Sequence, residues 1–94
     1  MNVIISPVPI QQGMVEILST CRNISRNGMH LELSLTFKKG EIVFLRCINN
    51  LNTNHIDMKC EVVWSAEISD KNLYRIGLKF LSFTESDYIK LLEF

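Results

Sequence analysis

The sequence predicts one small all-β domain, an antiparallel β-barrel followed by a single short C-terminal helix. Three observations predict it: polar and apolar residues alternate in several short segments, turn-forming residues separate these segments, and the periodicity changes near the C-terminus. The chain has 94 residues, of which 47% are hydrophobic, so it can bury one core. Many short strands with short connections favour a barrel over a layered α/β fold.

The N-terminal segment is expected to lie outside the barrel. Residues 1–13 are interpreted as a leader and residues 14–94 as the barrel domain with its helix. Pro7 and Pro9 have no backbone N–H, so a central strand is not expected here, although an edge strand remains open. Gly13 then separates the leader from the first predicted strand.

The first predicted hairpin joins residues 14–24, which are rich in β-branched and apolar side chains, to residues 29–37, in which polar and apolar residues alternate. Asn27-Gly28 lies between the two segments. This dipeptide favours a type I′ turn, in which both central residues have positive φ. The sequence therefore predicts two antiparallel strands with a tight connection.

Three more strands are expected over residues 41–48, 56–64 and 74–80. The first is apolar on both faces, which indicates a strand in the middle of a barrel. The other two alternate, which indicates half-buried strands with Trp64 on the core face. The asparagine-rich residues 49–54 are expected to form a loop.

The closing helix is predicted from its cap. Thr84 followed three residues later by Asp87 is a helix-capping pattern, in which each side chain reaches the other's backbone amide. Phe83 and Tyr88 occupy the two positions of a hydrophobic staple. The apolar residues that follow share one helical face, so a short amphipathic helix is expected to pack on the barrel.

Composition excludes several function classes. Ten basic residues balance ten acidic ones, which disfavours a DNA- or RNA-binding protein and a polybasic membrane surface. No apolar run approaches the roughly 18 residues of a spanning helix, and no signal peptide is expected, so the protein is predicted to be cytoplasmic. Cys21, Cys47 and Cys60 form no CxxC pair and are expected to be reduced, buried thiols. No metal site is predicted.

No catalytic residues are predicted, so the protein is not expected to be an enzyme. His30 and His55 lie on different elements, and each is expected to be solvated. The sequence contains no nucleophile elbow, glycine-rich phosphate loop or HExxH helix. A barrel that binds single-stranded nucleic acid would need a basic groove with exposed aromatic residues, and the zero net charge disfavours it.

The most informative stretch is residues 23–28, Asn-Ile-Ser-Arg-Asn-Gly. It resembles the (Asp or Asn)-x-Ser-x-x-Gly signature of PilZ domains. Residues 39–43, 60–64 and 74–80 resemble later strands of that family in the same order, the last with the sequence Tyr-Arg-Ile-Gly-Leu-Lys-Phe. The resemblance covers residues 14–94 and implies a small six-stranded antiparallel PilZ-like β-barrel with a short C-terminal α-helix.

The resemblance also implies a function. PilZ domains are bacterial, non-enzymatic receptor modules for cyclic di-GMP and need no other cofactor. Asn23 and Ser25 would correspond to side chains that hydrogen-bond a guanine of the ligand, and Gly28 would let the backbone turn tightly beside it. The chemistry fits, because an amide and a hydroxyl each donate and accept hydrogen bonds.

One part of the family pattern is missing. Members that bind the ligand well carry an Arg-x-x-x-Arg motif before the first strand, whereas residues 1–21 contain no arginine or lysine. Losing two charge-assisted hydrogen bonds would weaken binding roughly a hundredfold or more. Arg26, in the turn, is the expected partial substitute. Arg22 is not, because a regular strand points it to the face opposite Asn23.

Two functional interpretations follow. In the first, the chain is a regulatory module in cyclic di-GMP signalling with weak or lost direct binding. In the second, it is an adaptor in type IV pilus or flagellar motility that binds a protein partner and not the nucleotide, which an apolar patch near the helix or the 49–55 loop would support. The residues of this turn do not by themselves distinguish the two functions. Asn27-Gly28 is also favoured in a hairpin that binds no ligand, and the side chains of Asn23 and Ser25 can also cap backbone groups near a turn.

Overall fold

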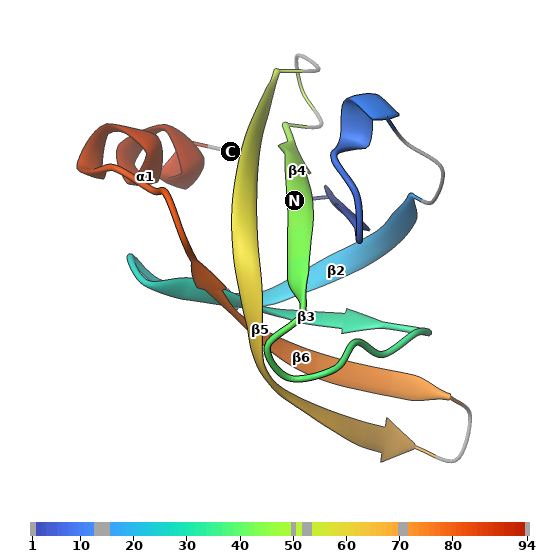
Figure 1. Cartoon of the computed structure of the whole chain (residues 1–94). Helices are drawn as coiled ribbons and strands as arrows, with labels where there is room; N and C mark the ends of the chain where they lie inside the picture. The colour runs from blue at the N-terminus through green and yellow to red at the C-terminus, as the bar shows by residue number, and fades with distance from the viewer. Residues whose placement is uncertain (1, 13–15, 50, 52–53, 70–71, 94) are drawn as a thin grey trace.

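The computed structural model describes residues 2–12, 16–49, 51, 54–69 and 72–93. Six strands form a closed antiparallel barrel in the order β1-β2-β3-β6-β5-β4, and one helix follows them (Figure 1). The elements are β1 (Asn2–Ser6), a 3-10 helix (Ile10–Gln12), β2 (Ile17–Ile24), β3 (Gly28–Leu33), β4 (Ile42–Ile48), β5 (His55–Ser69), β6 (Leu73–Phe80) and α1 (Glu85–Leu92). The predicted all-β class and the six-stranded barrel with a C-terminal helix are confirmed.

Strand β1 closes the barrel. It pairs with β2 on one side and with β4 on the other, and Val3 and Ile5 are fully buried in the core. The predicted leader, residues 1–13, is therefore corrected, because it contains a barrel strand. Both prolines of that segment follow β1, so neither interrupts its hydrogen bonds. The predicted boundary at Gly13 lies outside the described residues.

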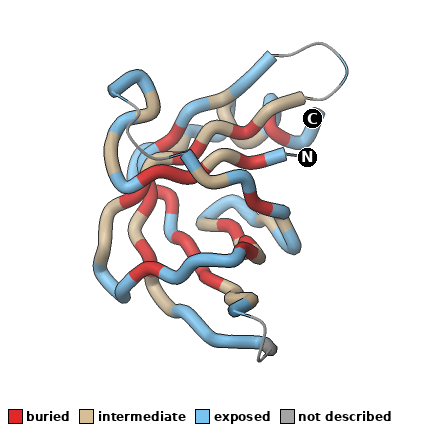
Figure 2. The backbone as a smooth tube through the Cα atoms, turned by 90° about the vertical axis from the view of Figure 1, so that its right-hand side faces the viewer, coloured by how far each residue is buried: buried red, intermediate tan, exposed pale blue. Residues whose placement is uncertain are grey.

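The inward-facing side chains of all six strands form the core, so buried and exposed positions alternate along the backbone (Figure 2). Cys47 and Cys60 belong to this core, and burial raises the pKa of both thiols to about 12. Both therefore stay protonated at neutral pH, as expected for structural cysteines. Cys21 is only half-buried, so the prediction of a buried thiol is wrong there; burial also raises its pKa.

Helix α1 begins with the predicted cap. The Thr84 hydroxyl accepts a hydrogen bond from the Asp87 amide, the Asp87 carboxylate accepts one from the Thr84 amide, and both distances are 3.1 Å. The rings of Phe83 and Tyr88 meet edge to face at 6.4 Å, as the staple predicts. Leu91 is the buried anchor of the helix. No helix among the described residues is long and apolar enough to span a membrane.

The connection between β2 and β3 differs from the prediction. Neither Asn27 nor Gly28 has positive φ, so the type I′ turn is wrong. Residues 25–27 form a longer connection, closed by a 2.9 Å hydrogen bond from the Ser25 amide to the Gly28 carbonyl. Gly28 is required for a different reason: a Cβ there would collide with the backbone carbonyl oxygen of Leu78 on β6.

A β-bulge interrupts β2 at Arg22. The pairing with β3 passes from Cys21 to Asn23, so Arg22 is an extra residue on this strand. An extra residue shifts the alternation of faces. Cys21 and Ile24 both pack against the core, while Arg22 and Asn23 are both exposed. The expectation that Arg22 and Asn23 point to opposite faces is therefore wrong.

Candidate functional site

A surface groove of about 530 Å³ runs along the outside of the barrel, beside the β2–β3 connection and across β6 to β5. Asn23, Ser25, Arg26 and Gly28 all line it. The structure therefore brings every residue of the predicted nucleotide site to one place. Their role in binding a ligand stays a prediction.

The structure of the β2–β3 connection explains why a serine occupies position 25, but it does not explain the asparagine at position 23. The Ser25 hydroxyl accepts a hydrogen bond of 3.4 Å from the Asn27 amide, which is a turn-stabilising contact. The Asn23 side chain is exposed and makes no hydrogen bond to any described residue. Its carboxamide is therefore free to donate to and accept from a molecule in the groove.

At the groove, a row of residues paired between neighbouring strands crosses four strands on the outer face of the barrel. Asn23 pairs with His30, His30 with Gly77, and Gly77 with Trp64. Gly77 has no side chain, and the Trp64 indole lies over it so closely that a Cβ would collide with the ring. The indole consequently reaches the His30 ring, with 5.1 Å between ring centroids and an angle of 79°.

Trp64 faces the groove because of a second bulge. The pairing of β5 with β6 passes from Val62 to Trp64, so Val63 is an extra residue. Val62 is fully buried, and without the bulge Trp64 would share its inward face. The prediction that Trp64 belongs to the core is wrong for this reason. The side chain instead gives the groove an aromatic wall.

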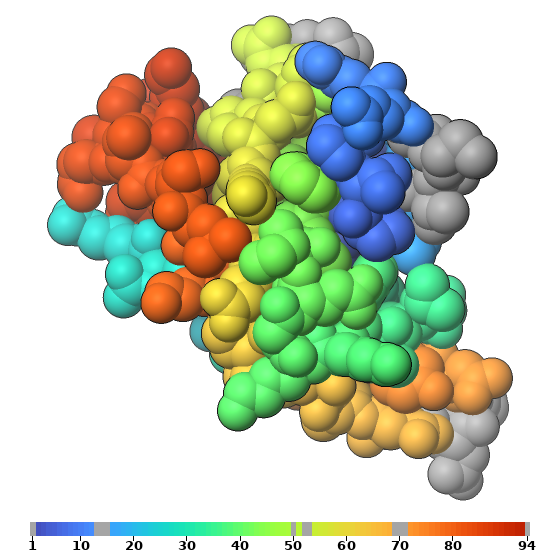
Figure 3. All heavy atoms as spheres, in the orientation of Figure 1, coloured from blue at the N-terminus to red at the C-terminus, as the bar shows by residue number. Residues whose placement is uncertain are grey.

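Two positively charged side chains lie at the groove. Lys79, paired with Gly28 across β3 and β6, is exposed and makes no ion pair with any described residue. The Arg26 guanidinium lies 2.9 Å from a Glu85 carboxylate oxygen and 5.5 Å from the centre of the Tyr88 ring. Figure 3 shows the β2–β3 turn directly beside α1. The residues that line the groove, as far as the structure describes them, include no carboxylate, so the charge of the groove favours an anionic ligand.

Comparison with known proteins identifies the family. A scan against protein-family models matches the PilZ domain over residues 4–94. The chain belongs to the PilZ domain family. A solved structure of a Bacillus subtilis inhibitor of motility (MotI/DgrA) has a similar fold, with a TM-score of 0.70 and 23% identity over 98% of this chain. This PilZ domain spans 43% of that protein. The search of curated proteins finds no match.

Family membership makes the chain a PilZ-type regulatory module, and no catalytic family is indicated. Within the described residues, no group of three or more His, Cys, Asp or Glu side chains is arranged to hold a metal ion. The groove of this PilZ domain presents hydrogen-bonding side chains, an aromatic wall and positively charged side chains.

Sequence reasoning missed three groove residues. His30 was expected to be solvated, Trp64 to be buried, and Lys79 was given no role. One signal was present: a glycine inside a strand marks a site where another group approaches the backbone closely, and Gly77 lies inside β6.

Proposed function

We propose that this PilZ domain is a cytoplasmic, non-enzymatic module of bacterial cyclic di-GMP signalling that binds the nucleotide directly but weakly in the groove. The observation that carries the proposal is the Asn23 carboxamide, which has no hydrogen-bond partner among the described residues and lies beside Ser25. The described residues that line the groove there include positively charged side chains and no carboxylate. Neither the turn nor the core requires an asparagine at that position, whereas a guanine edge offers both donors and acceptors for an amide.

The other groove residues fit the remaining parts of the ligand. The Trp64 and His30 rings provide an aromatic surface beside Asn23, and stacking of a base on an aromatic side chain contributes about 1–3 kcal/mol. Lys79 and Arg26 supply positive charge for the phosphates. The ligand would therefore lie along the outer faces of β3, β6 and β5, with one guanine near Asn23.

Two features make weak binding the expected result. Residues 2–12 carry no arginine or lysine, so β1 and the residues after it offer no guanidinium to the groove. In addition, Arg26 is already paired with Glu85. A phosphate that binds Arg26 must compete with that carboxylate, so occupation of the groove would loosen the contact between the turn and α1. This competition links ligand binding to the position of the helix.

Trp64 is the one tryptophan of the chain and therefore a local reporter of groove occupancy. Titration with cyclic di-GMP is expected to quench its fluorescence saturably, because a guanine would stack beside the indole. Cyclic di-AMP, which has the same phosphates and a different base edge, is the matched control and is expected to bind at least about tenfold more weakly. Equal responses to both nucleotides would contradict recognition of guanine by Asn23 and Ser25.

A second candidate function is an adaptor that docks on a protein of type IV pilus or flagellar motility. Ile89 and Leu92, three residues apart on α1, are 52% and 60% exposed. Leu51, in the predicted 49–54 loop, is 94% exposed. Exposed apolar side chains at these places favour a protein partner. Absence of any fluorescence response to cyclic di-GMP would favour this function over nucleotide binding. Residues 50, 52 and 53 of the loop lie outside the described residues.

A further inference from the structure

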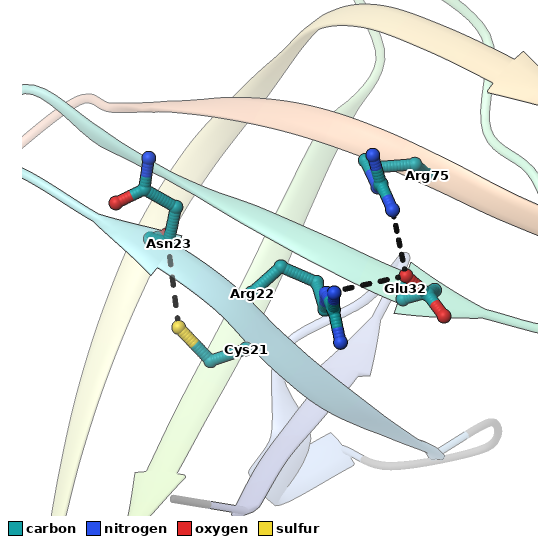
Figure 4. Close-up of polar contacts among 5 residues, drawn as sticks. All are labelled: Cys21, Arg22, Asn23, Glu32 and Arg75. Atoms are coloured by element: carbon teal, nitrogen blue, oxygen red, sulfur yellow. Dashed lines mark hydrogen bonds and ion pairs between the residues drawn. The ribbon is translucent and has the colours of Figure 1, made fainter.

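Two arginines share one carboxylate on the outer face of the barrel, next to the groove. Arg22 Nε lies 3.4 Å and Arg75 Nη2 lies 3.1 Å from the same Oε2 atom of Glu32. Figure 4 shows Glu32 between the two guanidinium groups, one from β2 and the other from β6. Because one negative charge faces two positive charges, the cluster has an excess of one positive charge.

The two guanidiniums retain unused donors. Each guanidinium carries five N–H donors, and only one contact from each reaches Glu32. The Nε of Arg75 is buried and has no acceptor among the described residues. The Glu32 side chain is 20% exposed, whereas those of Arg22 and Arg75 are 54% and 39% exposed. The carboxylate therefore lies deeper than the guanidiniums, which remain open to an anion from solvent.

The β-bulge of β2 creates this arrangement. It places Asn23 on the same outer face as Arg22, where a regular strand that continued the alternation of Ser19 and Cys21 would have turned Asn23 inward. At this bulge the Cys21 thiol donates to the Asn23 carbonyl oxygen at 3.7 Å, the contact drawn as a dashed line in Figure 4. The arginine pair and the predicted guanine contact thus occupy one surface.

The arginine cluster and the groove are close enough for one ligand to contact both. Glu32 and Arg75 pair with each other across β3 and β6, just as His30 and Gly77 do. The two pairs are two residues apart along each strand and face the same side, which places them about 7 Å apart. A nucleotide whose base lies by Trp64 and His30 can therefore reach the arginine pair with a phosphate.

We propose that Arg22 and Arg75 form an anion site for a phosphodiester group of a nucleotide lying in the groove, an assignment that rests on the proposed function. Planar guanidiniums bind phosphate oxygens through paired, charge-assisted hydrogen bonds. The two arginines provide the guanidinium pair that residues 2–12 lack. Glu32 keeps both groups in place when the site is empty and competes with the phosphate when it is occupied.

The first experiment measures cyclic di-GMP affinity in single variants. Arg22→Gln and Arg75→Gln are each expected to weaken binding about tenfold. Arg46→Gln is the matched control, because Arg46 also pairs with a carboxylate, that of Asp57, but lies on β4, which contributes no residue to the groove. It is expected to change affinity less than about twofold. Wild-type affinity in both Arg22→Gln and Arg75→Gln would overturn the proposal.

Glu32→Gln separates a ligand-binding role from a structural one. Removing the competing carboxylate is expected to tighten binding several-fold, although it also removes both ion pairs. If the cluster only stabilised the sheet, this variant would lose stability and gain no affinity. Unchanged or weaker binding by a folded Glu32→Gln variant would count against the proposal.

The second experiment does not depend on the nucleotide. Inorganic pyrophosphate is added to the wild-type protein, and the side-chain Nε–Hε signals of the arginines are followed by NMR. Saturable shifts are expected for Arg22 and Arg75, with none for Arg46. Such shifts without any binding of cyclic di-GMP would support the anion site and contradict the proposed function. Absence of shifts at both arginines would overturn the anion site, even if the nucleotide binds elsewhere in the groove.

Discussion

Gly28→Ala is expected to destabilise the barrel by about 3 kcal/mol, because the new methyl group has no room. It would overlap the backbone carbonyl oxygen of Leu78. That oxygen belongs to β6, which pairs with β3 from Gly28 to Leu33, so it cannot move aside without disturbing the ladder. The hairpin that carries Asn23 and Ser25 would shift as well, and ligand binding would weaken together with stability.

Thermal and denaturant unfolding measure this effect. A loss of about 3 kcal/mol lowers the Tm of a domain of this size by roughly 15 °C. Gly40→Ala is the matched control, because Gly40 has a φ of +90° and nothing near its missing Cβ. That change strains only the backbone and is expected to cost about 1–2 kcal/mol. If Gly28→Ala is no more damaging than Gly40→Ala, close approach to β6 does not explain the glycine.

Gly77→Ala is expected to remove the aromatic wall of the groove while leaving the barrel folded. The new methyl group would collide with the Trp64 indole, and a half-buried side chain at the surface can rotate away where a strand backbone cannot. The indole would then leave the His30 ring and enter solvent. Losing one stacked base contact, worth about 1–3 kcal/mol, weakens nucleotide binding by roughly five- to a hundredfold.

Tryptophan fluorescence reports this displacement before any ligand is added. The emission of Gly77→Ala is expected to shift to longer wavelength, because the indole becomes more hydrated. Trp64→Leu supplies the comparison for binding, since it removes the wall without crowding β6. An unchanged emission spectrum together with wild-type affinity in Gly77→Ala would show that Trp64 does not depend on the glycine and does not contact the ligand.

The sequence patterns correctly predicted the features that depend on residues close together in the chain. The alternation of β3 and β6 gave their core faces correctly, and the contact of Thr84 with Asp87 was visible as a helix cap. These features depend on residues within a few positions of one another, so the periodicity of a single segment carries the information. The family resemblance added the number of strands and the candidate site residues.

Features set by distant strands were not predicted. The bulges at Arg22 and Val63 arise from the register of neighbouring strands, and each reverses the faces expected for the residues beside it. They decide that Arg22 lies beside Asn23 and that Trp64 faces the groove. The strand within residues 1–13 was missed because prolines dominate the local pattern, whereas its partners on β4 are about 40 residues away.

Isothermal titration with cyclic di-GMP, applied to the wild-type protein and to the Asn23→Ala, Ser25→Ala double variant, tests whether the groove binds the nucleotide through these two side chains. Saturable binding in about the micromolar range is expected for the wild type, weakened at least about tenfold in a double variant that remains folded. Ser65→Ala, an exposed β5 substitution outside the groove lining, is expected to bind like the wild type. No heat from the wild type, or equal affinity in the double variant, would show that the groove does not recognise cyclic di-GMP through Asn23 and Ser25.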